Sequence, residues 1–245
     1  MTLPNLLIAG CQKSGTTWLH HCLSKSQYVY GSDVKELNFF NRPNYSDHVT
    51  EYEKNFQSEK SFKYYMESTP HYFRLPRKGV NIPKNIKSLL GEPKIIVLFR
   101  DPTDRYESAY IHHMMAGRFE YKTSINEVTD AHHMLALGRY AEIVKFWAGY
   151  FPNIRYFLYD DLGSKKLLIK NVMSYLDLHN DLEGERLNFF VNAKKKKIVS
   201  KRKGEGWGEI PRLTAEARKK LNEYYFSDVQ ELSSLIDRDL SHWLK

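Results

Sequence analysis

Short apolar runs bounded by polar and turn-forming residues predict the strands of a parallel β-sheet. The clearest run is KIIVLF at residues 94–99, and NLLIA at residues 5–9 is similar. Strands buried on both faces of a sheet show such continuous runs, whereas half-exposed strands alternate apolar and polar residues. Shorter runs at residues 64–68 and 154–158 predict two further strands.

Apolar side chains spaced three and four positions apart predict helices between and after these strands. Residues 138–150 show this spacing most clearly, and residues 18–24 and 103–115 each follow a predicted strand. Residues 214–240 are predicted to form two helices with a break at the Ser227-Asp228 pair. Strands that alternate with helices in this way indicate an α/β fold.

The domain organisation is predicted to be simple. No repeat and no Pro/Gly/Ser-rich linker divides the 245 residues, and 42% of them are hydrophobic, which is enough for one sizeable core. We expect a single α/β domain over residues 1–245, with a central parallel sheet flanked by helices. No run of 18 apolar residues is present, so no integral membrane segment is expected.

The cysteines and histidines do not form a metal-binding pattern. Cys11 and Cys22 lack a companion C-x-x-C or H-x-x-x-H motif, and they suit a reducing compartment better than a disulfide framework. The histidine pairs at 20–21, 112–113 and 132–133 would point in different directions on a helix, so we interpret them as surface or cleft residues. No metal cofactor is expected.

The basic composition favours anionic partners. The net charge is +8, and 14% of the residues are aromatic. Such a chain can attract nucleotides, phosphorylated or sulfated substrates, or nucleic acid, and the sign of the charge does not distinguish them. We expect no nucleic-acid partner, because the sequence shows neither a helix-turn-helix nor an RNP-like aromatic pair.

The segment GCQKSGTT at residues 10–17 has most of the features of a phosphate-binding loop. Its glycines stand five positions apart and a threonine closes it, as in G-x-x-x-x-G-K-[ST]. Thr16, however, occupies the position of the lysine, and Lys13 precedes the second glycine. Backbone N–H groups, hydroxyls and one lysine at the start of a helix form an anion site. The residues expected to bind phosphate are Lys13, Ser14, Gly15, Thr16 and Thr17.

The residue after the clearest strand argues against a nucleotide kinase, the alternative reading of this loop. A kinase holds Mg²⁺ with a loop Ser or Thr and an acidic residue, in many families an Asp at a strand end. No apolar strand here ends in an Asp, and KIIVLF is followed by Arg100. An arginine is unsuited to magnesium and well suited to phosphate.

Several motifs, in the same order along the chain, resemble those of sulfotransferases that use 3′-phosphoadenylyl sulfate (PAPS). KSGTTWL at residues 13–19 resembles the 5′-phosphosulfate loop of that family. RDPTDRYESAY at residues 100–110 resembles its 3′-phosphate motif. RKGEGW at residues 202–207 is similar to the loop that closes over the 3′-phosphate, although it is one residue shorter, and YDDL at residues 159–162 resembles Y-E-D-L.

Two motifs are similar to the heparan-sulfate and related carbohydrate branch of this family. KELNFF at residues 35–40 resembles K-E-P-x-F-F, and RDLSHW at residues 238–243 resembles the C-terminal segment of that branch. In K-E-P-x-F-F the glutamate is the general base, which implies that role for Glu36. The proline of the motif is replaced by Leu37 here. The other candidate base is His71, in ESTPHYF.

The resemblance implies a sulfotransferase fold and in-line transfer of a sulfuryl group from PAPS to a hydroxyl or amine. The product of the donor is 3′,5′-adenosine bisphosphate (PAP), and no metal is involved. Lys13 would stabilise the leaving phosphate and Lys35 would orient the sulfuryl group, although Lys35 can equally be a surface residue. The residues expected to bind the donor are Lys13, Ser14, Gly15, Thr16, Thr17, Trp18, Arg100, Ser108, Tyr159, Arg202, Lys203 and Gly204. Trp18 has two possible roles, stacking on the adenine of the donor or simple packing in the core.

A carbohydrate acceptor is favoured by the KELNFF and RDLSHW segments. A lipid or a small natural-product alcohol is the alternative. We expect a soluble, bacterial-type enzyme in the cytoplasm, with a trimmed Golgi-luminal domain as the other possibility.

Overall fold

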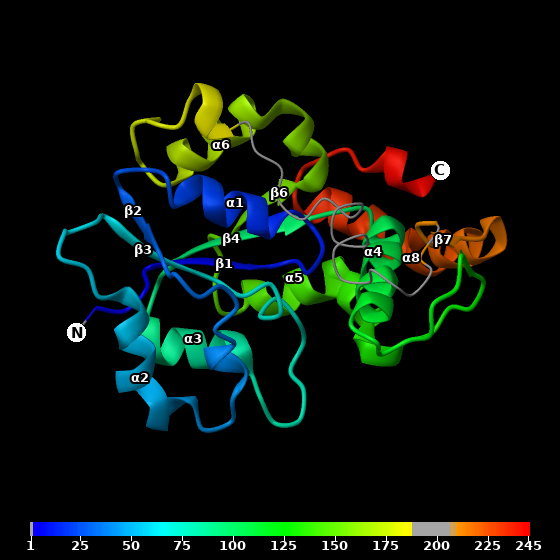
Figure 1. The fold of residues 1–245 in the computed structure, drawn as a ribbon, viewed down its shortest axis with the longest axis horizontal. Coiled ribbons are helices and arrows are strands. Elements are labelled where there is room, and N and C mark those ends of the chain that lie inside the picture. The colour runs from blue at the N-terminus through cyan, green and yellow to red at the C-terminus, as the bar shows by residue number, and fades with distance from the viewer. Residues whose placement is uncertain (1, 188–206, 208) are drawn as a thin grey trace. The chain divides into compact units, whose positions relative to one another are not determined.

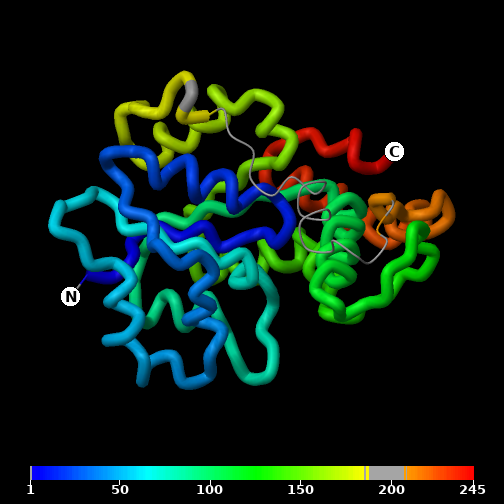
Figure 2. The backbone as a smooth tube through the Cα atoms, viewed as in Figure 1, coloured from blue at the N-terminus to red at the C-terminus, as the bar shows by residue number. Residues whose placement is uncertain are grey.

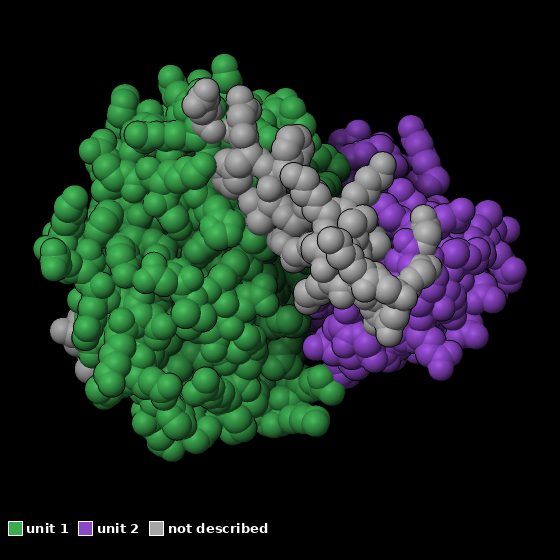
Figure 3. Space-filling model, in the orientation of Figure 1, with its two compact units in different colours: residues 1–99, 143–189 green, residues 100–142, 190–245 purple. Residues whose placement is uncertain are grey.

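The computed structural model describes residues 2–187, 207 and 209–245. The chain forms two compact units, shown in different colours in Figure 3. Unit 1 comprises residues 1–99 and 143–189, and unit 2 comprises residues 100–142 and 190–245. The single domain expected over residues 1–245 stays a prediction.

Unit 1 is built on a parallel sheet of five strands in the order β2-β3-β1-β4-β6 (Figure 1). The strands are β1 (Leu6–Gly10), β2 (Val29–Gly31), β3 (Tyr64–Ser68), β4 (Lys94–Phe99) and β6 (Arg155–Leu158). Strand β1 is buried along its whole length, and β4 from its second residue on, as their continuous apolar runs predict. The predicted fold class, a central parallel sheet flanked by helices, is confirmed.

Helices cover both faces of this sheet (Figure 1). They are α1 (Thr16–Leu23), α2 (Val49–Glu53), α3 (Ile82–Leu90) and α6 (Lys165–Tyr175), and α5 (Tyr140–Ala148) ends in this unit. The chain moves one way across the sheet from β1 to β2 and the opposite way from β3 to β4. Because crossovers are right-handed, α1 and α3 lie on opposite faces. The short 3₁₀ helices of unit 1 are Phe39–Asn41, Tyr45–His48, Lys54–Phe56, Tyr159–Ser164 and Gly184–Leu187.

The described part of unit 2 consists mainly of two helices and a small sheet. Its elements are α4 (Pro102–Met115), β5 (Ser124–Ile125), β7 (Arg212–Leu213), α8 (Ala215–Leu235) and the first residues of α5. Strands β5 and β7 pair in parallel. Its 3₁₀ helices are Ala131–His133, Ala136–Gly138 and Ser241–Leu244.

The predicted break near the Ser227-Asp228 pair is wrong, because α8 is one helix as far as Leu235. The buried carboxylate of Asp228 accepts a hydrogen bond from the backbone N–H of Ala141, at 3.1 Å. Ala141 lies in the first turn of α5, whose N–H groups have no partner within that helix. Asp228 therefore caps a neighbouring helix and leaves its own helix intact.

No helix among the described residues is long and apolar enough to cross a bilayer.

Candidate functional site

The GCQKSGTT segment forms a tight turn between β1 and α1, which the tube in Figure 2 follows. Gly15 precedes the first residue of α1 and has a φ of +88°, a left-handed conformation that favours glycine. A Cβ at this position would lie 2.8 Å from Leu162 Cδ1 and 3.2 Å from Tyr159 Cδ2. The YDDL segment therefore packs directly against the turn, and a Cβ at residue 15 would have to displace the end of the Leu162 side chain.

The turn offers donors that an anion can use. Ser14 is fully buried, and its hydroxyl oxygen has no hydrogen-bond partner among the described residues. Helix α1 has no acidic residue in its first turn. A buried polar group without a partner is unusual in a native protein, and a bound ligand can supply one. The burial of Ser14 and the start of α1 thus fit the predicted phosphate site.

Glu36 lies in the loop that follows β2, and the end of β3 holds its backbone. Its N–H donates to the carbonyl oxygen of Ser68 at 2.9 Å, and its carboxylate accepts from Lys35 Nζ at 3.0 Å. The Glu36 side chain is 44% exposed, whereas that of Lys35 is 15% exposed. The carboxylate can therefore meet a substrate, while its lysine partner is mostly covered.

The charges around Glu36 keep its carboxyl ionised. Burial acts to raise the pKa of Glu36, but Lys35, His71 and Lys13 together outweigh this effect and lower the pKa below its ordinary value. Burial lowers the pKa of Lys35, and the neighbouring Glu36 offsets part of that shift. The structure thus brings together four of the predicted catalytic residues: Lys13, Lys35, Glu36 and His71.

His71 is attached to the phosphate loop. Its Nε2 lies 2.9 Å from the side-chain nitrogen of Gln12. An amide nitrogen donates, so His71 Nε2 accepts this bond and is engaged. Gln12 had no role in the sequence-based prediction, because nothing in its local pattern marks it as a partner for a distant histidine.

His20, predicted to be a surface or cleft residue, is buried, and its Nδ1 lies 2.8 Å from Ser68 Oγ at the end of β3. Burial, with smaller contributions from Lys35 and His21, lowers the pKa of His20 to about 4. The imidazole is therefore neutral near pH 7 and acts as a hydrogen-bonding group beneath the Glu36 loop.

The two aromatic residues expected at the nucleotide differ in exposure. Trp18 is 7% exposed, and Lys165 Nζ lies 5.8 Å from its ring centroid. Tyr159 is 38% exposed, with its ring against Gly15. Stacking of Trp18 on adenine stays a prediction.

In unit 2, the residues of the second predicted phosphate site lie at and after the start of α4. Asp101 caps this helix by accepting from the N–H groups of Thr103 at 2.8 Å and Asp104 at 3.1 Å. Arg100 precedes the cap, and Ser108 is buried further along the helix.

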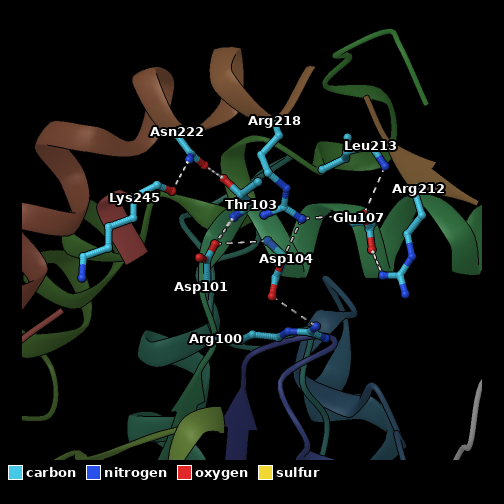
Figure 4. Close-up of polar contacts among 10 residues, drawn as sticks. All are labelled: Arg100, Asp101, Thr103, Asp104, Glu107, Arg212, Leu213, Arg218, Asn222 and Lys245. Carbon is cyan, nitrogen blue, oxygen red and sulfur yellow. Dashed lines mark hydrogen bonds and ion pairs between the residues drawn. The ribbon is translucent and has the colours of Figure 1, made fainter. Parts of the chain in front are cut away.

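Asp104 is shared by two arginines, which approach it from opposite sides in Figure 4. Arg100 Nη2 lies 3.7 Å from Asp104 Oδ2, and Arg218 Nη2 lies 3.0 Å from Asp104 Oδ1. Arg218, on α8, was not predicted, because a single arginine in a polar helix has no distinguishing pattern. The arrangement places a second guanidinium on the carboxylate that Arg100 contacts.

Glu107 connects α4 to the segment that leads into α8. Its buried carboxylate accepts from Arg212 Nη1 and from the backbone N–H of Leu213, both at 3.1 Å (Figure 4). Arg202, Lys203 and Gly204 lie outside the described residues. Trp207, which closes the same motif, packs on Tyr121 with ring centroids 4.4 Å apart.

Within the described part of the chain, no three or more His, Cys, Asp or Glu side chains group together in a way that could hold a metal ion.

A family model described as "Sulfotransferase domain" matches residues 3–233. The chain is also 25% identical over 292 residues to a bifunctional heparan sulfate N-deacetylase/N-sulfotransferase of Drosophila melanogaster, a match that covers 100% of this chain and 27% of that protein. It is 26% identical to bifunctional heparan sulfate N-deacetylase/N-sulfotransferase 2 of Bos taurus, covering 99% of this chain and 31% of that protein. The chain thus spans less than a third of the length of these relatives.

Solved structures share the fold. A sulfotransferase from Alicyclobacillus acidocaldarius matches with a TM-score of 0.77 at 20% identity, and the match covers 100% of both chains. A mouse sulfotransferase complexed with PAP matches with a TM-score of 0.52 at 13% identity, covering 95% of this chain and 87% of that one.

Proposed function

The chain belongs to the sulfotransferase family, and from this premise we propose that it transfers a sulfuryl group from PAPS to a hydroxyl or amine of an acceptor. The family predicted from the sequence is thereby confirmed. The two curated relatives named above carry the heparan sulfate name, which agrees with the predicted branch.

One arrangement carries the proposal: the N–H of Glu36 bonds the carbonyl of Ser68 at the end of β3, and Ser68 pairs with Ile8 of β1, the strand that leads into the phosphate loop with Lys13. Sulfuryl transfer needs a positive charge beside the leaving phosphate and a base beside the acceptor. Lys13 and Glu36 supply these groups from separate segments, with Lys35 and His71 around the carboxylate.

We assign the following chemistry to these residues. The bond between the sulfur and the bridging phosphate oxygen breaks as a bond forms between the sulfur and the acceptor atom on the opposite side. Glu36 takes the proton from the acceptor, and Lys13 stabilises the negative charge that develops on the leaving phosphate. Lys35 holds Glu36 in its ionised form and orients the sulfuryl oxygens. His71 is the alternative base, although its Nε2 already accepts from Gln12.

For the donor, we assign the 5′-phosphosulfate to the turn from Lys13 to Thr17, and the buried Ser14 hydroxyl supports this. We assign the 3′-phosphate to Arg100 and Ser108, with Arg202, Lys203 and Gly204 as predicted contributors. The PAP complex of the mouse sulfotransferase supports PAPS as the donor.

For the acceptor, we propose a carbohydrate. The names of the curated relatives refer to heparan sulfate, which is a carbohydrate, and they support this choice. The word N-sulfotransferase in these names refers to transfer to an amine, one of the two acceptor groups proposed above.

Binding and transfer can be tested separately. PAP without metal should raise the melting temperature, because a ligand that binds only the folded state stabilises it by mass action, whereas ATP with Mg²⁺ should have little effect. Transfer of ³⁵S from labelled PAPS should then be screened with sugar, lipid and phenol acceptors. The Glu36→Gln variant should keep the PAP shift and lose about a hundredfold or more in kcat. Stabilisation by ATP with Mg²⁺ but not by PAP would overturn the proposal.

A further inference from the structure

A buried carboxylate lies directly beneath the segment that carries Glu36. Glu67, in β3, is 1% exposed and accepts hydrogen bonds from three hydroxyls. Thr69 Oγ1 donates at 2.7 Å and the Tyr72 hydroxyl at 2.6 Å to Glu67 Oε1, and the Tyr52 hydroxyl donates to Oε2. Burial, the largest effect, and the neighbouring Glu67 raise the pKa of both phenols well above the ordinary value, so the two tyrosines remain donors.

Two of these hydroxyls hold the backbone of the KELNFF segment. The N–H of Asn38 donates to Thr69 Oγ1, and the N–H of Phe40 donates to the Tyr72 hydroxyl, both at 3.3 Å. A hydroxyl that gives its own proton to Glu67 keeps its lone pairs for an N–H donor. The direction of each pair of bonds is therefore fixed, because a backbone N–H can only donate to the hydroxyl, whose own proton is left for Glu67.

The third hydroxyl fixes the aromatic side chains of the same segment. The ring of Tyr52 stacks on that of Phe39 with centroids 3.8 Å apart and planes 6° apart, and it meets Phe40 edge-on at 5.7 Å. Both phenylalanines are buried. Glu67 is thus connected to the segment through its backbone and through its side chains.

This segment needs such support because its backbone is strained. Glu36 has a φ of +65° and Asn38 a φ of +54°, in the left-handed region that L-residues seldom occupy. Residues held there persist only when the surrounding structure fixes them, and such strain concentrates at functional sites. The hydroxyls bonded to Glu67 supply two of the fixed points, at Asn38 and Phe40.

We propose that Glu67 is a positioning residue for sulfuryl transfer: through Thr69 and Tyr72 it fixes the backbone of residues 38–40 and thereby the place of the Glu36 carboxylate. This proposal rests on the proposed function, since it takes Glu36 as the base. Glu67 touches neither donor nor acceptor. Its loss should change the rate of transfer and leave donor binding intact.

The Glu67→Gln variant tests the direction of the hydrogen bonds while keeping the shape. The new amide nitrogen faces Tyr52 if it replaces Oε2, or Thr69 and Tyr72 if it replaces Oε1, so it reverses at least one of the bonds that hold the segment. We expect kcat to fall by about tenfold to a hundredfold, because a small misplacement of a reacting group costs that much. The KM for PAPS and the PAP-induced thermal shift should be unchanged. Wild-type kcat, or a parallel loss of PAP stabilisation, would overturn the positioning role.

Two matched variants at Thr69 test the same proposal if Glu67→Gln fails to fold. Thr69→Val removes the hydroxyl at constant shape and should lower kcat, whereas Thr69→Ser keeps the hydroxyl and should retain it. Equal kcat in the valine and serine variants would overturn the proposal.

Amide hydrogen exchange separates this proposal from the proposed function. In Glu67→Gln the amides of Asn38 and Phe40 should exchange faster, while the amide of Cys11, bonded to the Leu98 carbonyl at 2.8 Å, should not change. This result holds even if no acceptor is sulfated or if Glu36→Gln retains turnover, either of which counts against the proposed function. Unchanged exchange at Asn38 and Phe40 would overturn the role of Glu67 alone.

Discussion

Substitution of Gly15 by alanine measures how tightly the phosphate loop is built. The left-handed φ of +88° costs an L-residue about 1 to 2 kcal/mol. The added Cβ would also lie 2.8 Å from Leu162 Cδ1. That atom is the end of a flexible side chain, so a change of rotamer can relieve the contact at a cost of about 0.5 to 1.5 kcal/mol. After the gain from a less flexible unfolded chain, Gly15→Ala should lose about 2 kcal/mol of unfolding free energy.

Gly79 provides the matched control. It also has a left-handed φ, of +77°, but a Cβ there would meet nothing within 4 Å. Gly79→Ala should therefore lose only the conformational part, about 1 kcal/mol after the gain from a less flexible unfolded chain. The difference between the two variants isolates the steric contact with the YDDL segment.

Urea unfolding of both variants gives the two free energies. Adding Leu162→Ala to Gly15→Ala should restore part of the lost stability, because the substitution removes the atom nearest to the new Cβ. The PAP-induced thermal shift should be lost in Gly15→Ala and kept in Gly79→Ala. If Gly15→Ala were no less stable than Gly79→Ala and still bound PAP, the close packing of the loop would be refuted.

Three further outcomes follow from charges and caps in the two units. Lys35→Met should move the acid limb of the kcat–pH profile to higher pH, because Lys35 lowers the pKa of Glu36; an unmoved limb would contradict the pairing. His20, with its pKa lowered to about 4, stabilises the fold above pH 6.5 and loses this contribution as the pH falls toward 4. Between pH 6.5 and pH 4 the His20→Gln variant should therefore lose about 3 kcal/mol less unfolding free energy than the wild type, measured by urea unfolding at several pH values. Asp228→Ala should cost about 1 to 2 kcal/mol by uncapping α5, whereas Asp228→Asn, which keeps a side-chain oxygen, should cost less; equal losses on thermal unfolding would argue against the cap.

The sequence predicts those strands whose burial leaves a continuous apolar run. Strands β1 and β4 appear close to their expected bounds for this reason. Strand β2, with the sequence VYG, has too little pattern of its own, and it exists because it pairs with β3. Helix α8 shows the opposite case, since a residue with low helix propensity, Asp228, is accommodated by a contact far away in the sequence.

The candidate site was predictable only where a motif marks it. Lys13, Lys35 and Glu36 belong to recognisable segments, and the structure places them together. Gln12 and Glu67 lie within or beside such segments, but their roles depend on partners brought close by the fold. A pattern of residue types along one chain carries no information on these distances.

Leu37 stands where the K-E-P-x-F-F motif that KELNFF resembles has a proline, which bears on how this loop is held. A proline fixes its own φ and restricts the residue before it, so K-E-P-x-F-F constrains the glutamate covalently. Leu37 removes that constraint, and Asn38 takes a left-handed conformation that asparagine tolerates better than most residues. The Asn38 side chain accepts from Asn41 Nδ2 at 2.8 Å, and its N–H donates to Thr69.

Glu36 and Glu67 lie in opposite environments, which suit them to different roles. Glu36 is partly exposed among cations, which lower its pKa and keep it ready to accept a proton. Glu67 is buried among hydroxyls, and burial raises its pKa although each hydroxyl bond lowers it. Titratable groups whose environments push their pKa values apart commonly have different roles in an active site. A carboxylate that is fully buried and bonded on both oxygens cannot reach a substrate, so in the proposed role Glu67 acts on the reaction through the segment that it holds, by its backbone and by its aromatic side chains.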